Sequence, residues 1–212
     1  MLTAILSLTM LISNGQEIDK DKEVSHKRSA AFSEIQDGVY FSFAEVKQNK
    51  PSISKEQLIK SYYDKTDFTL SQWANTENLF YLDNNGVKRK VNRDSLWGYV
   101  EEGTPFILLN GRFYKFYTIG TISVFVESYP TIQQTVAPVL TDVHSGTYNR
   151  LFDFSNGQIG DYDVTNLTMV LAKDTALYND FQELKNMKAK RKKMYKYIER
   201  YNDKHTLFTS SK

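Results

Sequence analysis

Three histidines are the residues of this 212-residue chain best suited to acid–base chemistry: His26, His144 and His205. They are far apart in the sequence, and none has a second His, Asp or Glu at the spacing of a zinc or iron site. His144 alone stands in a plausible loop site, the segment TDVHSG, which also contains Asp142. One hypothesis is therefore a hydrolase with an unfamiliar site around Asp142, His144 and Glu101, although such groups are normally assembled from distant segments.

Two adjacent carboxylates, Glu101 and Glu102, suggest the acid and base of a glycosidase. Adjacent residues at the end of a strand point apart, however, so the segment EEG is better explained as a solvated turn. The segment DYDVTN lacks the spacing of a calcium-binding EF-hand loop, which favours helix capping. No phosphate-binding glycine loop, dinucleotide fingerprint or G-x-S-x-G motif is present, so we predict neither a cofactor nor a metal site.

Aromatic side chains offer a different kind of binding chemistry, since the chain contains 14 Tyr and 13 Phe. Trp97 precedes Gly98 in the segment SLWGYVEEG and would stack on a sugar if it lay at a sheet surface. Packing of this ring in the core is the alternative. If Trp97, Tyr99 and Phe113 share an open groove, a ligand site becomes the leading interpretation.

The segment KNMKAKRKKMYKYIERYNDKH, residues 185–205, is strongly basic. From Lys173 to Lys212 there are 11 Lys or Arg and 5 Asp or Glu, which gives this part a charge of +6 in a chain of net charge +2. A helix here would place most of the candidate anion-binding residues away from its apolar stripe: Lys188, Lys190, Lys192, Lys193 and Lys196. They either keep a packed helix soluble or contact anionic envelope material. Base-specific nucleic-acid binding is disfavoured, because the aromatics fall mainly on the buried stripe and Lys outnumbers Arg.

The elements that must position these residues start with a short strand, predicted at Val39–Phe41. Ser42 then begins an S-x-x-E sequence, the capping pattern of a helix N-terminus. The related S-x-x-Q pattern at Ser54 predicts a second helix through about Tyr63.

Strands are predicted from Thr66 to Tyr129, where the hydrophobic pattern changes. The segment LFYLDNNGVKRKV reads as a hairpin, and LWGYVEEGTPFILLNGRFYKFYTIGTISVFVE supplies four more strands with breaks at glycines. This pattern predicts an antiparallel meander whose core includes Phe113, Phe116, Ile122, Val124 and Val126. Farther on, TVAPVL is an edge strand or an extended loop, and YNRLFDFSNGQIGDY is a hairpin that turns at Asn156-Gly157.

The end of the chain is predicted to be helical. Asp163 or Thr165 caps one helix, and Asp174 caps the next, which runs to about Tyr201 with a break near Asn186. Helical spacing joins seven apolar side chains into one stripe: Leu177, Phe181, Leu184, Met187, Met194, Ile198 and Tyr201.

Together these elements predict an α+β fold. It has two short N-terminal helices, an antiparallel meander sheet of about six to eight strands, and a basic C-terminal helical segment packed on the sheet. We expect residues 35–208 to form a single domain, preceded by a flexible lead-in over residues 16–34 and followed by a disordered tail over residues 209–212.

The first residues, MLTAILSLTMLISNGQ, match a secretory signal. Leu2–Ile12 is uncharged, and its length suits the apolar region of a signal peptide better than a membrane span. Small residues at Ser13 and Gly15 fit cleavage before Gln16, so residues 1–15 are predicted to be removed. Because the chain has no Cys, the lipid anchor of an exported bacterial lipoprotein, which needs a Cys at the cleavage site, is excluded, and so are disulfides and thiolate metal sites. We expect a bacterial periplasmic or secreted protein.

Several motifs resemble those of a group of uncharacterised exported proteins of Gram-negative, gut-type bacteria, of the kind described as domains of unknown function. These motifs are a GVY-aromatic start followed by N-K-P-S, a W-G-aromatic strand, G-x-F-Y-x-F followed by I-G-x-I-S, and a helix ending in I-x-x-Y-N-x-x-H. The likeness covers roughly Asp37 to Phe208. It implies export and a single domain, and it supplies no active site.

Two classes of function follow from these observations. The first is a non-enzymatic cell-envelope module that binds a glycan, a protein or an anionic surface. The second is the hydrolase with a site near Asp142 and His144.

Overall fold

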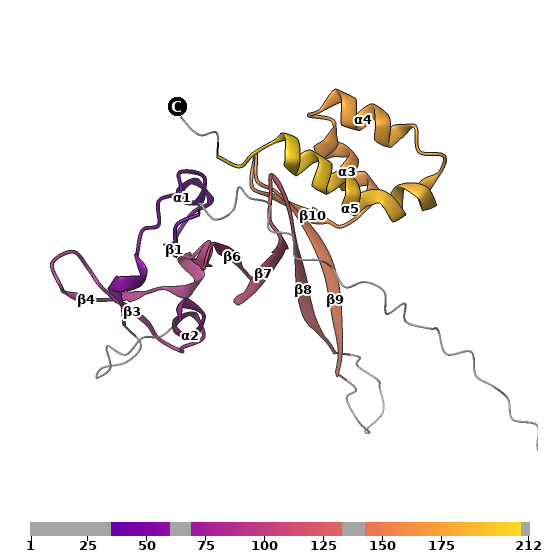
Figure 1. Cartoon of the computed structure of the whole chain (residues 1–212). Coiled ribbons are helices and arrows are strands. Elements are labelled where there is room, and N and C mark those ends of the chain that lie inside the picture. Colours follow the sequence, from indigo (N-terminus) through magenta and orange to yellow (C-terminus); the bar gives the residue numbers. More distant parts are fainter. Residues whose placement is uncertain (1–34, 60–68, 133–142, 209–212) are drawn as a thin grey trace, which may run out of the picture.

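The computed structural model describes residues 35–59, 69–132 and 143–208 (Figure 1). The predicted signal peptide and lead-in, the segment TVAPVL and the C-terminal tail therefore lie outside the described residues. The fold is α+β, as the sequence predicts: an antiparallel seven-stranded sheet, a smaller three-stranded sheet, and helices mainly at the C-terminal end. Among the described residues, no helix combines the length and the apolar composition that a membrane span requires.

The large sheet is a meander with one added edge strand. Its order is β1 (Gly38–Tyr40), β5 (Gly98–Glu101), β6 (Thr104–Leu109), β7 (Arg112–Thr118), β8 (Ile122–Ile132), β9 (Val143–Asp153) and β10 (Gln158–Asp161). Turns at Glu102-Gly103 and Asn110-Gly111 have positive φ at both residues, which explains why the breaks between strands carry these residue types. The β9–β10 hairpin likewise turns at Gly157, where φ is +79°.

A second sheet contains β2 (Leu58–Ile59), β3 (Leu79–Leu82) and β4 (Lys88–Val91). The prediction of a helix after Ser54 is therefore wrong over residues 55–59, the part of that segment that the structure describes. Its capping box forms, but the helix is a single 3-10 turn at Lys55–Gln57, because the next two residues pair with β3. The prediction of strands from Thr66 onward also fails at α2 (Leu70–Ala74), whose own capping box joins Thr69 and Gln72.

Most helices begin at the capping residues that the sequence predicts. The Ser42 Oγ accepts from the backbone N–H of Glu45 at the start of α1 (Phe43–Lys47). Asp163 caps α3 (Val164–Leu171), and Asp174 caps α4 (Thr175–Gln182). A further 3-10 turn lies at Arg93–Ser95.

The helix α5 (Met187–Lys204) carries the basic segment. Asn186 caps it, which confirms the predicted break and makes α4 and α5 separate helices. Most of the apolar stripe is buried: Leu177, Phe181, Met194, Ile198 and Tyr201 are each at most 3% exposed. Leu184 is partly buried against them, and Met187 is 52% exposed, because it lies at the first turn of α5.

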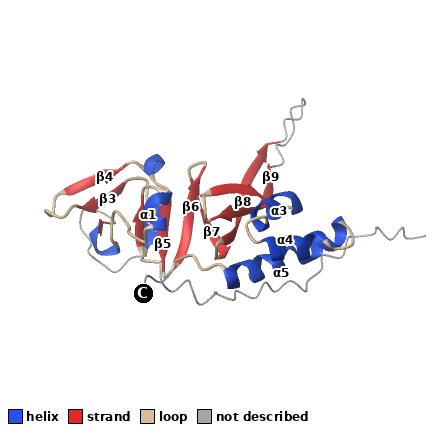
Figure 2. Cartoon of the chain, turned by 90° about the horizontal axis from the view of Figure 1, so that it is seen from above, coloured by secondary structure: helices blue, strands red, loops and turns tan. Residues whose placement is uncertain are grey.

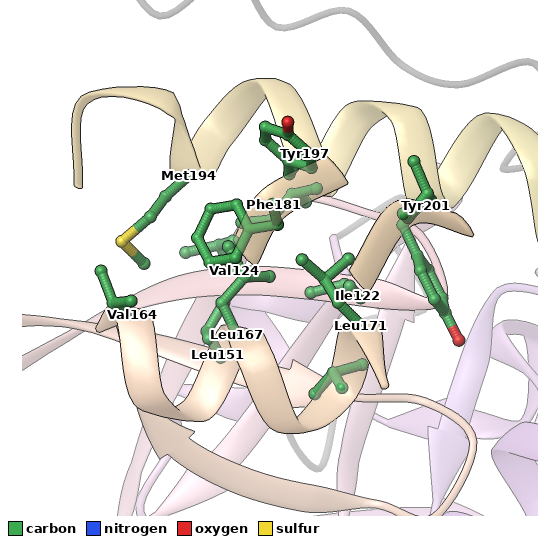
Figure 3. Close-up of a cluster of buried hydrophobic side chains, with 13 residues drawn as sticks. Ile122, Val124, Leu151, Val164, Leu167, Leu171, Phe181, Met194, Tyr197 and Tyr201 are labelled. Carbon is green, nitrogen blue, oxygen red and sulfur yellow. The ribbon is translucent and has the colours of Figure 1, made fainter. Parts of the chain in front are cut away.

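Three hydrophobic clusters cover the two faces of the large sheet. Face A, which includes Tyr40, Val100, Phe116 and Phe125, packs against α1. Face B is shared. Its β1–β5–β6 part, with Val39 and Tyr99, packs against α2 and the small sheet, and its β8–β9 part packs against α3, α4 and α5 (Figure 3). The small sheet and the C-terminal helices therefore lie toward opposite ends of the molecule (Figure 2).

The predicted core residues follow this division with one correction. Phe116, Ile122 and Val124 are buried, and Phe113 is partly buried against the small-sheet cluster. Val126 is 38% exposed, because it lies on face B beyond the helices that cover Ile122 and Val124.

Candidate functional site

The outer side of α5 is the strongest candidate for a functional surface. Lys188, Lys192 and Lys196 are exposed and stand four residues apart, so they form a row with about 6 Å between successive positions along the axis. Arg191 and Lys193 are exposed on either side of this row. Within the described part of the chain, none of the three lysines in the row takes part in an ion pair. We call these five residues the basic face.

Packing of the other side of α5 fixes the direction of the basic face. Met194, Ile198 and Tyr201 are buried against α3, α4 and the sheet, so the row of lysines points away from them. The first ten residues of α5 contain six Lys or Arg and no Asp or Glu. The acidic residues of α5, Glu199 and Asp203, stand in its second half.

Lys190 is a correction to the predicted set. It is only partly exposed, and its ammonium lies 5.5 Å from the centre of the Phe181 ring and donates to Gln182 Oε1 at 2.5 Å. This lysine therefore ties α5 to α4. Arg200 does the same farther along through its ion pair with Asp180, whose pKa it lowers.

The three candidate ligand-binding aromatics do not share one groove. Tyr99 and Phe113 are in contact with ring centroids 5.0 Å apart, in the cluster beneath the small sheet. Trp97 packs in the face A cluster, near Phe43 and Phe152. Tyr99 is only 2% exposed, and its burial raises its pKa to about 12. The ring of Tyr99 thus offers no open surface to a sugar.

The groups of the hydrolase hypothesis fall in different places. The carboxylate of Glu101 accepts from the backbone N–H of Ser71 at 3.4 Å, at the start of α2. Strands β6, β7 and β8 separate Glu101 in β5 from His144 in β9, which at the usual strand spacing is about 19 Å along the sheet. Asp142 lies outside the described residues, and of His144 only the backbone is described.

His205 ends α5 rather than forming a reactive site. Its Nε2 lies 3.0 Å from Asp174 Oδ2, and its ring lies against that of Tyr201. The Lys204 ammonium also pairs with Asp174 at 3.1 Å. The hydrogen bond from the Leu177 N–H, together with these partners, holds the pKa of Asp174 well below its usual range. These contacts fasten the end of α5 to the start of α4.

A serine–lysine contact, which the sequence does not indicate, lies at the β9–β10 turn. Lys173 Nζ is 2.5 Å from both Ser155 Oγ and Asp153 Oδ2, and the Ser155 hydroxyl donates to Asp153 Oδ1 at 2.6 Å. A lysine that activates serine must be neutral, whereas Lys173 forms an ion pair with the Asp153 carboxylate. The trio therefore serves to tie the turn to the α3–α4 connection.

Two pairs of the sequence motifs described above meet in space. A Cβ on Gly38 of the GVY motif would lie 2.6 Å from Pro51 of N-K-P-S. A Cβ on Gly120 of I-G-x-I-S would lie 2.1 Å from Asn202 of the C-terminal motif. These spacings require glycine for packing, so both motif pairs have a structural explanation that involves no catalysis.

Comparisons with known proteins identify no relative: no protein-family model, curated protein or solved structure matches the chain. The described residues also contain no cluster of three or more His, Cys, Asp or Glu suited to a metal ion. Within the described part of the chain, the basic face therefore offers the chemistry best suited to binding a partner.

Proposed function

We propose that this chain is a non-enzymatic, exported module of the bacterial cell envelope that docks on a lipid surface bearing anionic phosphate headgroups. The observation that carries the proposal is the basic face of α5, in which the row Lys188, Lys192 and Lys196 forms no ion pair among the described residues. The apolar start of the chain and its lack of Cys support export.

The placement of charge on α5 opposes helix stability. Lys188–Lys192 and Lys192–Lys196 are like-charge pairs four residues apart, each of which destabilises a helix by about 0.2–0.5 kcal/mol. The first turn contains no acidic residue, although the helix dipole favours negative charge there. A surface required only for solubility would mix charges of both signs. An external anionic partner explains why one sign is concentrated at this end.

The shape and composition of the basic face favour a lipid surface over a groove-filling ligand. The row stands on the convex outer side of a helix, and Lys provides diffuse attraction rather than the bidentate geometry of Arg. Each lysine near an anionic surface adds about 1 kcal/mol of binding free energy.

The proposal is tested by co-sedimentation of the full chain with vesicles. We expect binding to vesicles of equal parts phosphatidylglycerol and phosphatidylcholine, and none to phosphatidylcholine alone. Replacing the row by Lys188→Glu, Lys192→Glu and Lys196→Glu together removes at least about 3 kcal/mol, a loss of affinity of roughly 100-fold or more, because the three added carboxylates also repel the surface. Binding should also weaken as salt rises above about 0.15 M, because the charges are exposed.

A matched control separates the basic face from total charge. Lys50, Lys55 and Lys115 are exposed elsewhere on the molecule, so their replacement by Glu changes the net charge by the same amount. This control variant should retain most of the binding to anionic vesicles. Absence of binding by the wild type, or equal loss in both triple variants, would reject docking through α5. Binding to a soluble polyphosphate but not to vesicles would reject the lipid surface as the partner.

A further inference from the structure

Three tyrosines from distant parts of the chain meet at one place on face B. Tyr117 is the last residue but one of β7, Tyr162 lies between β10 and α3, and Tyr195 stands on α5. All three are partly exposed, and Tyr117 and Tyr162 pack against the α3–α5 cluster. Burial raises the pKa of Tyr117, and the nearby phenols of Tyr162 and Tyr195 raise it further. We call this group the tyrosine cluster.

An irregularity in the sheet brings Tyr117 to this position. Phe116 is paired with Phe125 and Thr118 with Val124, so one extra residue, Tyr117, is inserted into β7. A bulge of this kind redirects side chains and is common beside functional sites. The bulge lies at the boundary between the two parts of face B, since Phe113 of β7 packs under the small sheet and Tyr117 packs under the helices.

Polar groups beside the tyrosine cluster are available to a ligand. Asn149 of β9 is exposed, and its Oδ1 accepts from the Tyr117 hydroxyl at 3.3 Å, a long hydrogen bond at a solvent-accessible position. Its backbone carbonyl accepts from the N–H of Tyr162 at 3.1 Å. Among the described residues, the Asn149 amide nitrogen has no acceptor. Val126, opposite Asn149 in β8, adds a 38% exposed apolar side chain.

The chemistry of this group differs from that of the basic face. Phenol hydroxyls and a carboxamide are neutral donors and acceptors, and tyrosine rings add flat apolar faces. A tyrosine hydroxyl, whose ordinary pKa is about 10, is a protonated donor at neutral pH, and burial raises the pKa of Tyr117, Tyr162 and Tyr195 further. The charged neighbours of Tyr195 one turn away on α5 are Glu199 on one side and Arg191 and Lys192 of the basic face on the other. A ligand with hydroxyl groups, apolar ring faces and no charge fits this set.

We propose that Tyr117, Tyr162, Tyr195 and Asn149 bind a neutral sugar unit of a glycan. The hydroxyls of the sugar replace the long Tyr117–Asn149 bond and meet the free Asn149 amide, while a tyrosine ring covers one sugar face. This site borders the basic face at Tyr195, but its contacts with the ligand are uncharged, whereas lipid docking depends on the lysine charges.

The test uses the full chain and three soluble probes: tetrasaccharides of β-1,4-linked N-acetylglucosamine, β-1,4-linked glucose and α-1,4-linked glucose. Saturation-transfer NMR detects contact, and a titration gives the dissociation constant. We expect at least one probe to bind in the millimolar range or tighter. Loss of one hydrogen-bonding group in Tyr195→Phe or Asn149→Ala should weaken binding by about fivefold.

The control is Tyr148→Phe, the neighbour of Asn149 that stands on face A and is 54% exposed. The affinity of the Tyr148→Phe variant for the probe should equal that of the wild type. Sugar binding should also persist at high salt, whereas vesicle binding through α5 should not, so failure of one proposal is distinguishable from failure of the other. No binding of any probe, or equal affinity of Asn149→Ala and wild type, would overturn the sugar site.

Discussion

The contact between Asn202 of α5 and Ile122 of β8 is the most sensitive point in the attachment of the helix to the sheet. The Asn202 amide donates to the Ile122 carbonyl at 2.8 Å, and its Oδ1 accepts from the Ile122 N–H at 2.8 Å. Both hydrogen bonds are buried, and Asn202 is only 7% exposed. The side chain thus takes the place of a peptide group in a neighbouring strand.

Asn202→Ala removes both partners of the Ile122 peptide groups at once. A buried polar group without a partner costs about 1–3 kcal/mol, so we expect the free energy of unfolding to fall by about 3 kcal/mol. For a protein of this size, that corresponds to a fall in Tm of about 6–12 °C. The loss exceeds that of a typical surface substitution by several fold.

Urea unfolding followed by far-ultraviolet circular dichroism measures the change. Asn179→Ala is the matched control, because Asn179 is exposed on α4, and its free energy of unfolding should stay within about 0.5 kcal/mol of the wild type. Asn202→Asp retains an acceptor but cannot donate to the Ile122 carbonyl, so it should also destabilise. A loss below about 1 kcal/mol in Asn202→Ala would refute the argument, because it would mean that the two bonds contribute little.

Two further predictions concern charged groups. Because the pKa of Asp174 is lowered in the folded protein, its stabilisation is complete above the unfolded value of about 4 and is lost as the pH falls below it. Thermal unfolding should therefore show that Asp174→Asn is less stable at neutral pH and loses less stability on acidification than the wild type. Arg150→Met leaves the buried Glu127 carboxylate without the guanidinium 2.8 Å away and should destabilise by about 3 kcal/mol in urea unfolding. Glu127→Gln should cost less, since an amide is easier to bury than a carboxylate.

Local signals explain which elements the sequence predicts correctly. Helix starts at Ser42, Asp163 and Asp174 depend on one side chain and the next few backbone groups, so they can be read from spacing alone. The turns at glycines are predicted correctly for the same reason, because they also depend on adjacent residues. The segment after Ser54 shows the limit, because its capping box forms while pairing with β3, a distant segment, replaces the predicted helix.

The candidate sites show the same contrast. The exposed row on α5 follows from helical period, and the structure confirms the exposure of Lys188, Lys192 and Lys196. The position of Lys190 depends on α4 folding back beside α5, which periodicity along one helix cannot reveal. The tyrosine cluster depends on a bulge and on three separate elements, so no local pattern points to it. Only contacts between distant residues define such a site.

Gly120 offers a test of whether the Asn202 contact acts as a unit. A Cβ at Gly120 would lie 2.1 Å from the Asn202 side chain, so Gly120→Ala must displace that side chain and break its bonds to Ile122. The variant should therefore destabilise about as much as Asn202→Ala. In the double variant Gly120→Ala/Asn202→Ala the smaller side chain removes the clash, so its unfolding free energy should be close to that of Asn202→Ala alone. If urea unfolding instead gives the sum of the two single effects, Gly120 acts through some other contact, and the packing argument for the two motifs fails.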